Sequence, residues 1–120
     1  MINSKSKGKR GELELVKVLK QLGFEARRTQ QYSGAEGTSD VTIKGASRLH
    51  VECKYQALPN IQKAMQQADN DRSSDSIAVV CSRRVDRLET ERYEWLLTVK
   101  LVDLCELVDV ISTVKENYAT

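Results

Sequence analysis

Several residue types are scarce in this sequence, and each scarcity excludes a class of protein. One proline and six glycines in 120 residues, together with regular apolar periodicity, exclude a disordered or low-complexity chain. Three cysteines, Cys53, Cys81 and Cys105, form an odd set without CxxC spacing, which favours neither a disulfide framework nor a zinc site. All three lie in apolar stretches, so we expect small buried side chains.

Long apolar runs are also missing. The N-terminal segment is polar and basic and lacks the apolar stretch of a signal peptide. The richest apolar stretch, residues 95–111, contains four charged side chains, which argues against a membrane span. We therefore expect a cytoplasmic protein, and the length fits one domain, residues 1–120.

The charge is unevenly distributed along the chain. Residues 1–60 carry 11 Lys and Arg against 6 Asp and Glu, whereas residues 61–120 carry 8 against 11. The basic half is expected to face a polyanion, or else to be an ordinary solvated surface. Within it, residues 1–8 are predicted to form a flexible basic arm, which Lys9 and Arg10 extend.

Apolar periodicity predicts the element order αβββαββα. A helix from about Lys9 to Leu22 ends at Gly23, and strands follow over 24–29, 40–43 and 49–55, the last two joined by the turn 44–47. A helix after Pro59, strands over 77–81 and 93–99, and a final helix from Leu101 complete the chain. The order predicts an α/β fold with a mixed central β-sheet flanked by helices.

The third predicted strand carries a carboxylate and an ammonium group on one face. Side chains alternate along a strand, so Glu52 and Lys54 project together. If this strand pairs with the preceding one, Asp40 comes near the same surface, although the register is not fixed by the sequence. A cross-strand ion pair on a solvated face is the alternative interpretation.

The first helix supplies a third carboxylate. At about 100° per residue, Glu12 lies roughly 40° to 50° from the centre of the apolar stripe and Glu14 more than about 100° away. Glu12 therefore leans toward the sheet, where a carboxylate needs a cation or hydrogen bonds. An acid favoured by the helix dipole is the alternative. Together, Glu12, Asp40 and Glu52 would form an oxygen-only site suited to Mg²⁺ or Mn²⁺ and to phosphodiester hydrolysis.

The pattern Asp40, eleven residues, then Glu52-Cys53-Lys54 resembles the D-xₙ-E-x-K signature of the PD-(D/E)XK nuclease superfamily. The opening Lys7-Gly8-Lys9-Arg10-Gly11-Glu12, the segment Leu22-Gly23-Phe24, Arg28 and the Ser/Gly loop are similar to archaeal-type Holliday junction resolvases over about residues 5–56. Two positions depart from the pattern: Ser39 replaces the proline before Asp40, and Gln56 continues the strand motif.

The resemblance implies a restriction-endonuclease-like core and a homodimer that cuts four-way DNA junctions with Mg²⁺. It implies that Glu12, Asp40 and Glu52 bind the metal and that Lys54 is catalytic. Arg28 matches an arginine near the scissile region, and Ser33 or Ser39 matches a loop serine. The DNA-binding residues expected from charge and resemblance are Lys7, Lys9, Arg10, Arg27, Arg28, Ser33, Ser39 and Gln56.

Other functions remain open at this point. A repair, replication or restriction-type nuclease would use the same chemistry on other DNA structures. A DNA-binding module of the same fold would bind without cutting. The single histidine, His50, faces the same side as Glu52 and is expected to be half exposed.

Overall fold

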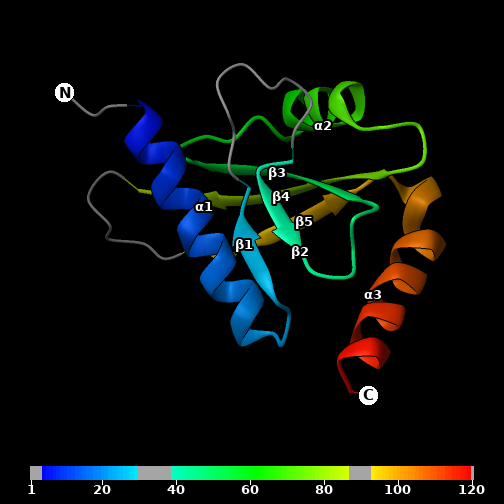
Figure 1. Ribbon diagram of the computed structural model, residues 1–120. Helices are drawn as coiled ribbons and strands as arrows, with labels where there is room; N and C mark the ends of the chain where they lie inside the picture. The colour runs from blue at the N-terminus through cyan, green and yellow to red at the C-terminus, as the bar shows by residue number, and fades with distance from the viewer. Residues whose placement is uncertain (1–3, 30–38, 87–92, 120) are drawn as a thin grey trace.

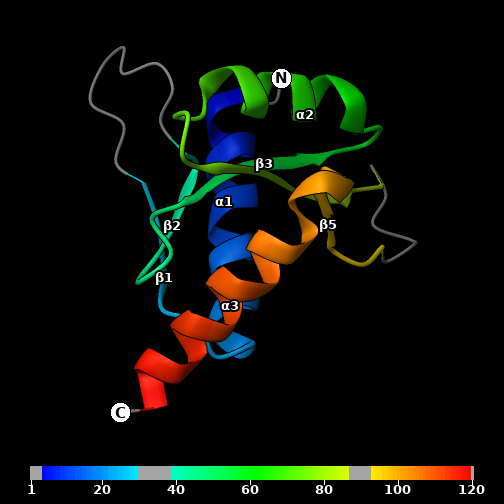
Figure 2. The same cartoon turned by 90° about the vertical axis from the view of Figure 1, so that its right-hand side faces the viewer.

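The computed structural model describes residues 4–29, 39–86 and 93–119. These residues form three layers, with helix α2 (Ile61–Asp71) on one face of a β-sheet and helices α1 (Ser4–Gln21) and α3 (Leu104–Ala119) on the other (Figure 1). Figure 2 shows α2 above the strands and α3 below them. The expected element order and mixed α/β architecture are confirmed.

The sheet contains five strands in the spatial order of the sequence: β1 (Ala26–Arg28), β2 (Val41–Ile43), β3 (Leu49–Gln56), β4 (Ile77–Arg84) and β5 (Leu96–Val99). β3 and β4 run parallel and are connected through α2, as a parallel pair requires, while the other neighbours are antiparallel. In the antiparallel pair of β2 and β3, Val41 lies opposite Val51. Among the described residues, β3 continues beyond this pair toward Gln56 with no further β2 residue paired to it. We call the point where this pairing ends the strand opening.

Two apolar clusters hold the layers together. The larger one joins α1 and α3 to the sheet and includes Leu15, Val51 and Val114. The smaller one joins α2 to the sheet through Ala64 and Ala68, which are at most 1% exposed. Alanines on a helix face let its backbone approach the strands closely, so the end of α2 lies near β3.

Helix α1 also approaches β3 closely, through Gly11. A Cβ atom built on Gly11 would overlap the Cβ of Tyr55, so only glycine fits at this point of contact. The ring of Tyr55 in turn stacks on Trp95, with centroids 5.9 Å apart. This contact places Glu12, the next residue of α1, directly beside the sheet.

The boundaries of α1 differ from the prediction at one end. The helix begins at Ser4 and not at Lys9, so residues 4–8, which were expected to belong to a flexible arm, lie in the helix. Lysine is a good helix former, and no proline interrupts this segment. The other end is as expected, since Gly23 follows the helix with a φ of +94°, a conformation that glycine adopts readily.

Three further expectations need correction. β4 extends to Arg84 and not only to Cys81, because its last residues pair with β3 although they are polar. β5 begins at Leu96 and not at Tyr93. Cys105 is exposed and not buried, because α3 turns other residues, such as Leu107, toward the core. No helix in the described part of the chain is both long and apolar enough to cross a bilayer.

Candidate functional site

Asp40 directly precedes β2, at the strand opening where the pairing of β2 with β3 ends. The pairing of Val41 with Val51 puts Asp40 level with Glu52. Its Oδ2 atom accepts a 2.8 Å hydrogen bond from the backbone N–H of Cys53, so the carboxylate takes the place of a strand partner. Burial raises the pKa of Asp40, although the Cys53 hydrogen bond opposes this. The Asp40 carboxylate is therefore held against the backbone of β3 at the strand opening.

Glu52 and Lys54 share the face of β3 that α2 covers. The Lys54 Nζ atom is 3.6 Å from Glu52 Oε1, and the Glu52 side chain is only 8% exposed. Burial, and then repulsion from Asp40, raise the pKa of Glu52 to about 7, while Lys54 counteracts the shift. A buried carboxylate with a second carboxylate beside it is the usual environment of a functional acid.

Glu12 reaches the sheet from the opposite side. Arg28 of β1 donates a 3.0 Å hydrogen bond from Nε to Glu12 Oε1, which provides the cation that a core-facing carboxylate needs. Burial nevertheless raises the pKa of Glu12, and Asp40 contributes to the shift. Asp40 thus interacts electrostatically with both Glu12 and Glu52.

A second group of potential ligands involves Glu52. One ligand atom from each of His50, Glu52 and Asp71 lies within 4.8 Å of the other two, which allows a shared metal ion. His50 precedes Glu52 on the same face of β3, and Asp71 is the last residue of α2. His50 is only 5% exposed, not half exposed as expected. Helix α2 packs against this face of β3, which accounts for the burial of His50.

The three predicted metal ligands, Glu12, Asp40 and Glu52, come from three different segments of the fold. Glu52 belongs to the group that includes His50 and Asp71. Asp40 lies beside it at the strand opening, and Glu12 of α1 is paired with Arg28 of β1. The structure places Lys54 next to Glu52, as expected. The catalytic and metal-binding roles of these residues stay predictions.

The residues predicted to bind DNA have varied surroundings. Ser39 helps to pair β2 with β3, because its Oγ atom accepts a 2.8 Å hydrogen bond from the Val51 N–H and donates to the Val41 carbonyl. The Gln56 side-chain amide donates to the Leu58 carbonyl at 3.4 Å. The exposed ones include Lys9, Arg10 and Arg27, whereas Arg28 is partly buried. Ser33 and the side chain of Lys7 lie outside the described residues.

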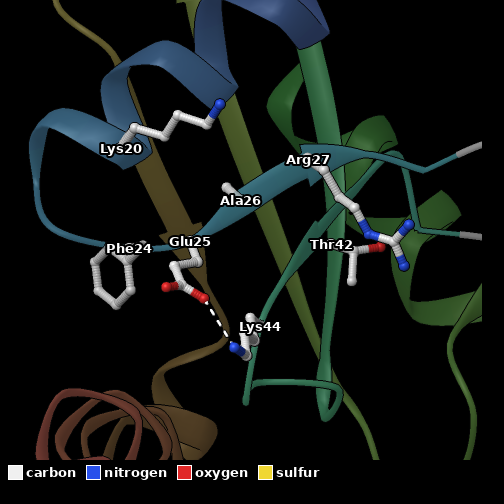
Figure 3. A pocket seen from close by; sticks show the side chains of 7 residues that line it. All are labelled: Lys20, Phe24, Glu25, Ala26, Arg27, Thr42 and Lys44. Atoms are coloured by element: carbon white, nitrogen blue, oxygen red, sulfur yellow. Dashed lines mark ion pairs between the residues drawn. The ribbon is translucent and has the colours of Figure 1, made fainter. Parts of the chain in front are cut away.

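A surface pocket lies over β1 and β2, and its lining does not include Glu12, Asp40 or Glu52. Figure 3 shows its lining side chains, among which Lys44 pairs with Glu25 at 3.2 Å. Lys20 and Arg27 add two further cations around the hollow. None of the four predicted catalytic residues lines this pocket. The pocket therefore contributes positive charge near β1 and none of the acid chemistry.

Fold and site together define an α/β protein with the buried Glu52 and the partly buried Asp40 at the strand opening, and with a group able to hold a metal ion. No protein-family model matches the chain, and no curated protein is significantly similar to it. The function is therefore inferred from the site itself.

Sequence reasoning did not identify Asp71 as a site residue. Residues 69–75 combine acids, Asn and Ser, and this composition indicates only the end of a helix. One signal was present for His50, because the alternation of β3 puts it on the side of Glu52. The proximity of His50 to Asp71 depends on how α2 packs against the sheet, and no local sequence pattern predicts that packing.

Proposed function

We propose that this protein is a divalent-metal-dependent endodeoxyribonuclease of the PD-(D/E)XK type, with a restriction-endonuclease-like core, that cleaves four-way DNA junctions. The observation that carries the proposal is the placement of Asp40 level with Glu52, with the Lys54 ammonium 3.6 Å from Glu52. Two carboxylates and one lysine at a strand opening are the groups that phosphodiester hydrolysis needs.

The chain's own groups would divide the chemistry between them. The oxygens of Asp40 and Glu52 suit a hard cation such as Mg²⁺, and Mn²⁺ is expected to substitute. When bound there, the metal would neutralise phosphate charge and increase the acidity of a bound water. Lys54, with its side chain 27% exposed, would orient the attacking water or stabilise the negative charge that develops on the phosphate.

Arg28 would link DNA binding to the acids. The Arg28 side chain is 34% exposed while it is paired with Glu12, so it can contact both the carboxylate and an approaching phosphate. A phosphate that attracts Arg28 would take this cation away from Glu12. The Glu12 carboxylate would then be free to face Asp40, with which it already interacts electrostatically. Arg28 is therefore proposed to hold the scissile phosphate.

Arg28→Ala is expected to reduce cleavage by roughly 10- to 100-fold, the value of one charge-assisted hydrogen bond. Arg27→Ala is the matched control, since Arg27 lies on the same short strand with its side chain exposed. Each change removes one cation, so both should weaken nonspecific duplex binding equally in a salt titration. Equal cleavage rates for the two variants would contradict the role proposed for Arg28.

The substrate symmetry favours a homodimer. A four-way junction is close to two-fold symmetric, so two copies related by a two-fold axis would place one site on each of two opposing strands. Strand β5 is at an edge of the sheet. Four apolar side chains in this strand and directly after it are 54% to 86% exposed: Leu96, Leu97, Leu101 and Val102. An apolar edge of this kind is suited to pairing, and we propose that a second copy of the chain covers it.

The deciding experiment compares a synthetic four-way junction with linear duplex of the same sequence, with Mg²⁺ and with EDTA. The proposal expects metal-dependent, symmetric cuts in the junction, and light scattering should give the mass of two chains. Equal rates on both substrates would indicate a repair, replication or restriction-type nuclease. Binding of branched DNA with steep salt dependence, but without cutting in Mg²⁺ or Mn²⁺, would indicate a noncatalytic module.

A further inference from the structure

We propose that His50, Glu52 and Asp71 form a binding site for a divalent first-row transition metal, which takes Mn²⁺, Co²⁺ or Zn²⁺ in preference to Mg²⁺. The site lies between β3 and the end of α2. It shares only Glu52 with the nuclease site proposed above, and it concerns metal binding by the protein without DNA.

The distances are those of a site that needs little rearrangement. One ligand atom from each of the three residues lies within 4.8 Å of the others. Ligands bound at about 2.0 to 2.2 Å from one ion are roughly 3 to 4 Å apart. Small side-chain rotations would therefore bring the three groups onto one cation.

The imidazole of His50 supplies independent evidence for a ligand. His50 is 5% exposed, and its Nε2 atom is buried without a hydrogen-bond partner among the described residues. Leaving such a nitrogen unpaired is unfavourable, and buried polar atoms in native proteins almost always have a partner. A metal ion between His50 and the two carboxylates would give the imidazole that partner.

The charges around the group also favour a cation. Asp71 ends α2, and a carboxylate at a helix C-terminus is disfavoured by the helix dipole. Within the described ranges, the Asp71 carboxylate has no hydrogen bond or ion pair. The neighbouring Arg72 is engaged by Asp69 at 2.6 Å and by backbone carbonyls. Lys54 is paired with Glu52, so none of the cations in the described part of the chain is shown to pair with Asp71.

The donor set determines which cation fits. Carboxylates alone suit Mg²⁺, Ca²⁺ and Mn²⁺, whereas an imidazole nitrogen favours transition metals. Mg²⁺ also dehydrates reluctantly and prefers oxygen ligands. One nitrogen and two carboxylates should therefore bind Co²⁺ or Zn²⁺ more tightly than Mn²⁺, and Mn²⁺ more tightly than Mg²⁺.

The test measures metal binding by the full chain after removal of metals with EDTA. Mn²⁺ binding is followed by the loss of the free-ion electron paramagnetic resonance signal, and Mg²⁺ is added as a competitor. Asp71→Asn is expected to weaken Mn²⁺ binding by about tenfold or more. His50→Gln replaces the nitrogen by an amide oxygen, and it should remove the preference for Mn²⁺ over Mg²⁺.

Two controls separate this site from the nuclease site. Asp109→Asn removes an exposed carboxylate of α3 and should leave Mn²⁺ binding unchanged. Asp40→Asn disables the proposed nuclease site, yet it should retain Mn²⁺ binding that depends on Asp71. Circular dichroism establishes that each variant is folded. Unchanged Mn²⁺ affinity in Asp71→Asn, or an unchanged Mn²⁺/Mg²⁺ ratio in His50→Gln, overturns the proposal whether or not the protein cuts DNA.

Discussion

Glu52→Gln is expected to reduce Mg²⁺-dependent cleavage of a four-way junction at least about a thousandfold, with binding of the junction retained. The amide has nearly the same shape but removes the charge that would hold the metal, and the loss of an electrostatic group at a reaction centre has effects of this size. Asp40→Asn should act similarly, because Asp40 lies level with Glu52 at the strand opening. Initial rates under single-turnover conditions and a gel-shift titration measure the two effects separately.

The matched control for this experiment is Glu116→Gln, the same chemical change at an exposed position of α3. It should leave both the cleavage rate and junction binding unchanged. If Glu52→Gln lost binding and cleavage in parallel, Glu52 would contribute to DNA affinity or folding, and the separate metal-binding role would be wrong. If it retained full cleavage, the proposed nuclease site would be wrong.

Glu52→Gln is also expected to stabilise the metal-free protein at pH 8. In the folded protein, burial and Asp40 raise the pKa of Glu52 to about 7 from an ordinary value of 4.5. The folded state therefore holds this proton more tightly than the unfolded state, and the stability that it contributes is lost as pH rises from about 4.5 through 7. A pKa shift of this size corresponds to about 3 kcal/mol of folding stability. The Glu52→Gln variant does not lose this stability as pH rises, because its amide stays uncharged.

Urea unfolding with EDTA present, at pH 4.5 and at pH 8, measures this effect. The variant and the wild type should have nearly equal free energies of unfolding at pH 4.5, and the variant should be more stable at pH 8. Glu116→Gln should show no comparable pH-dependent difference. A variant that is less stable than the wild type at pH 8 would show that the contact with Lys54 outweighs the cost of burying the charge.

The element order could be predicted from the sequence because each element has its own apolar periodicity or is bounded by a residue typical of helix ends and turns. The stripe of α1 and the Gly23 stop are local signals, and so is the turn at Gly45, which has a φ of +84°. The ends of elements were less predictable. Arg83 and Arg84 are charged, so they do not look like strand residues, yet pairing with β3 keeps them in β4.

The site could be predicted only where one element determines the direction of a side chain. Helical phase correctly directed Glu12 toward the sheet, and strand alternation put Glu52 and Lys54 on one face. Neither helical phase nor strand alternation predicts how far one element lies from another. The partner of Glu12 is Arg28, 16 residues away in sequence, and Asp71 reaches His50 only because α2 packs through alanines against β3 and β4.

The contact between Gly11 and Tyr55 determines how far this chain can vary. The backbone of α1 lies against Tyr55 with no space for a Cβ atom, so even alanine at position 11 would push the helix outward and move Glu12 with it. Related chains that exchange one acid for another would still be expected to retain glycine here. A steric constraint beside the site therefore falls on a residue that has no side chain.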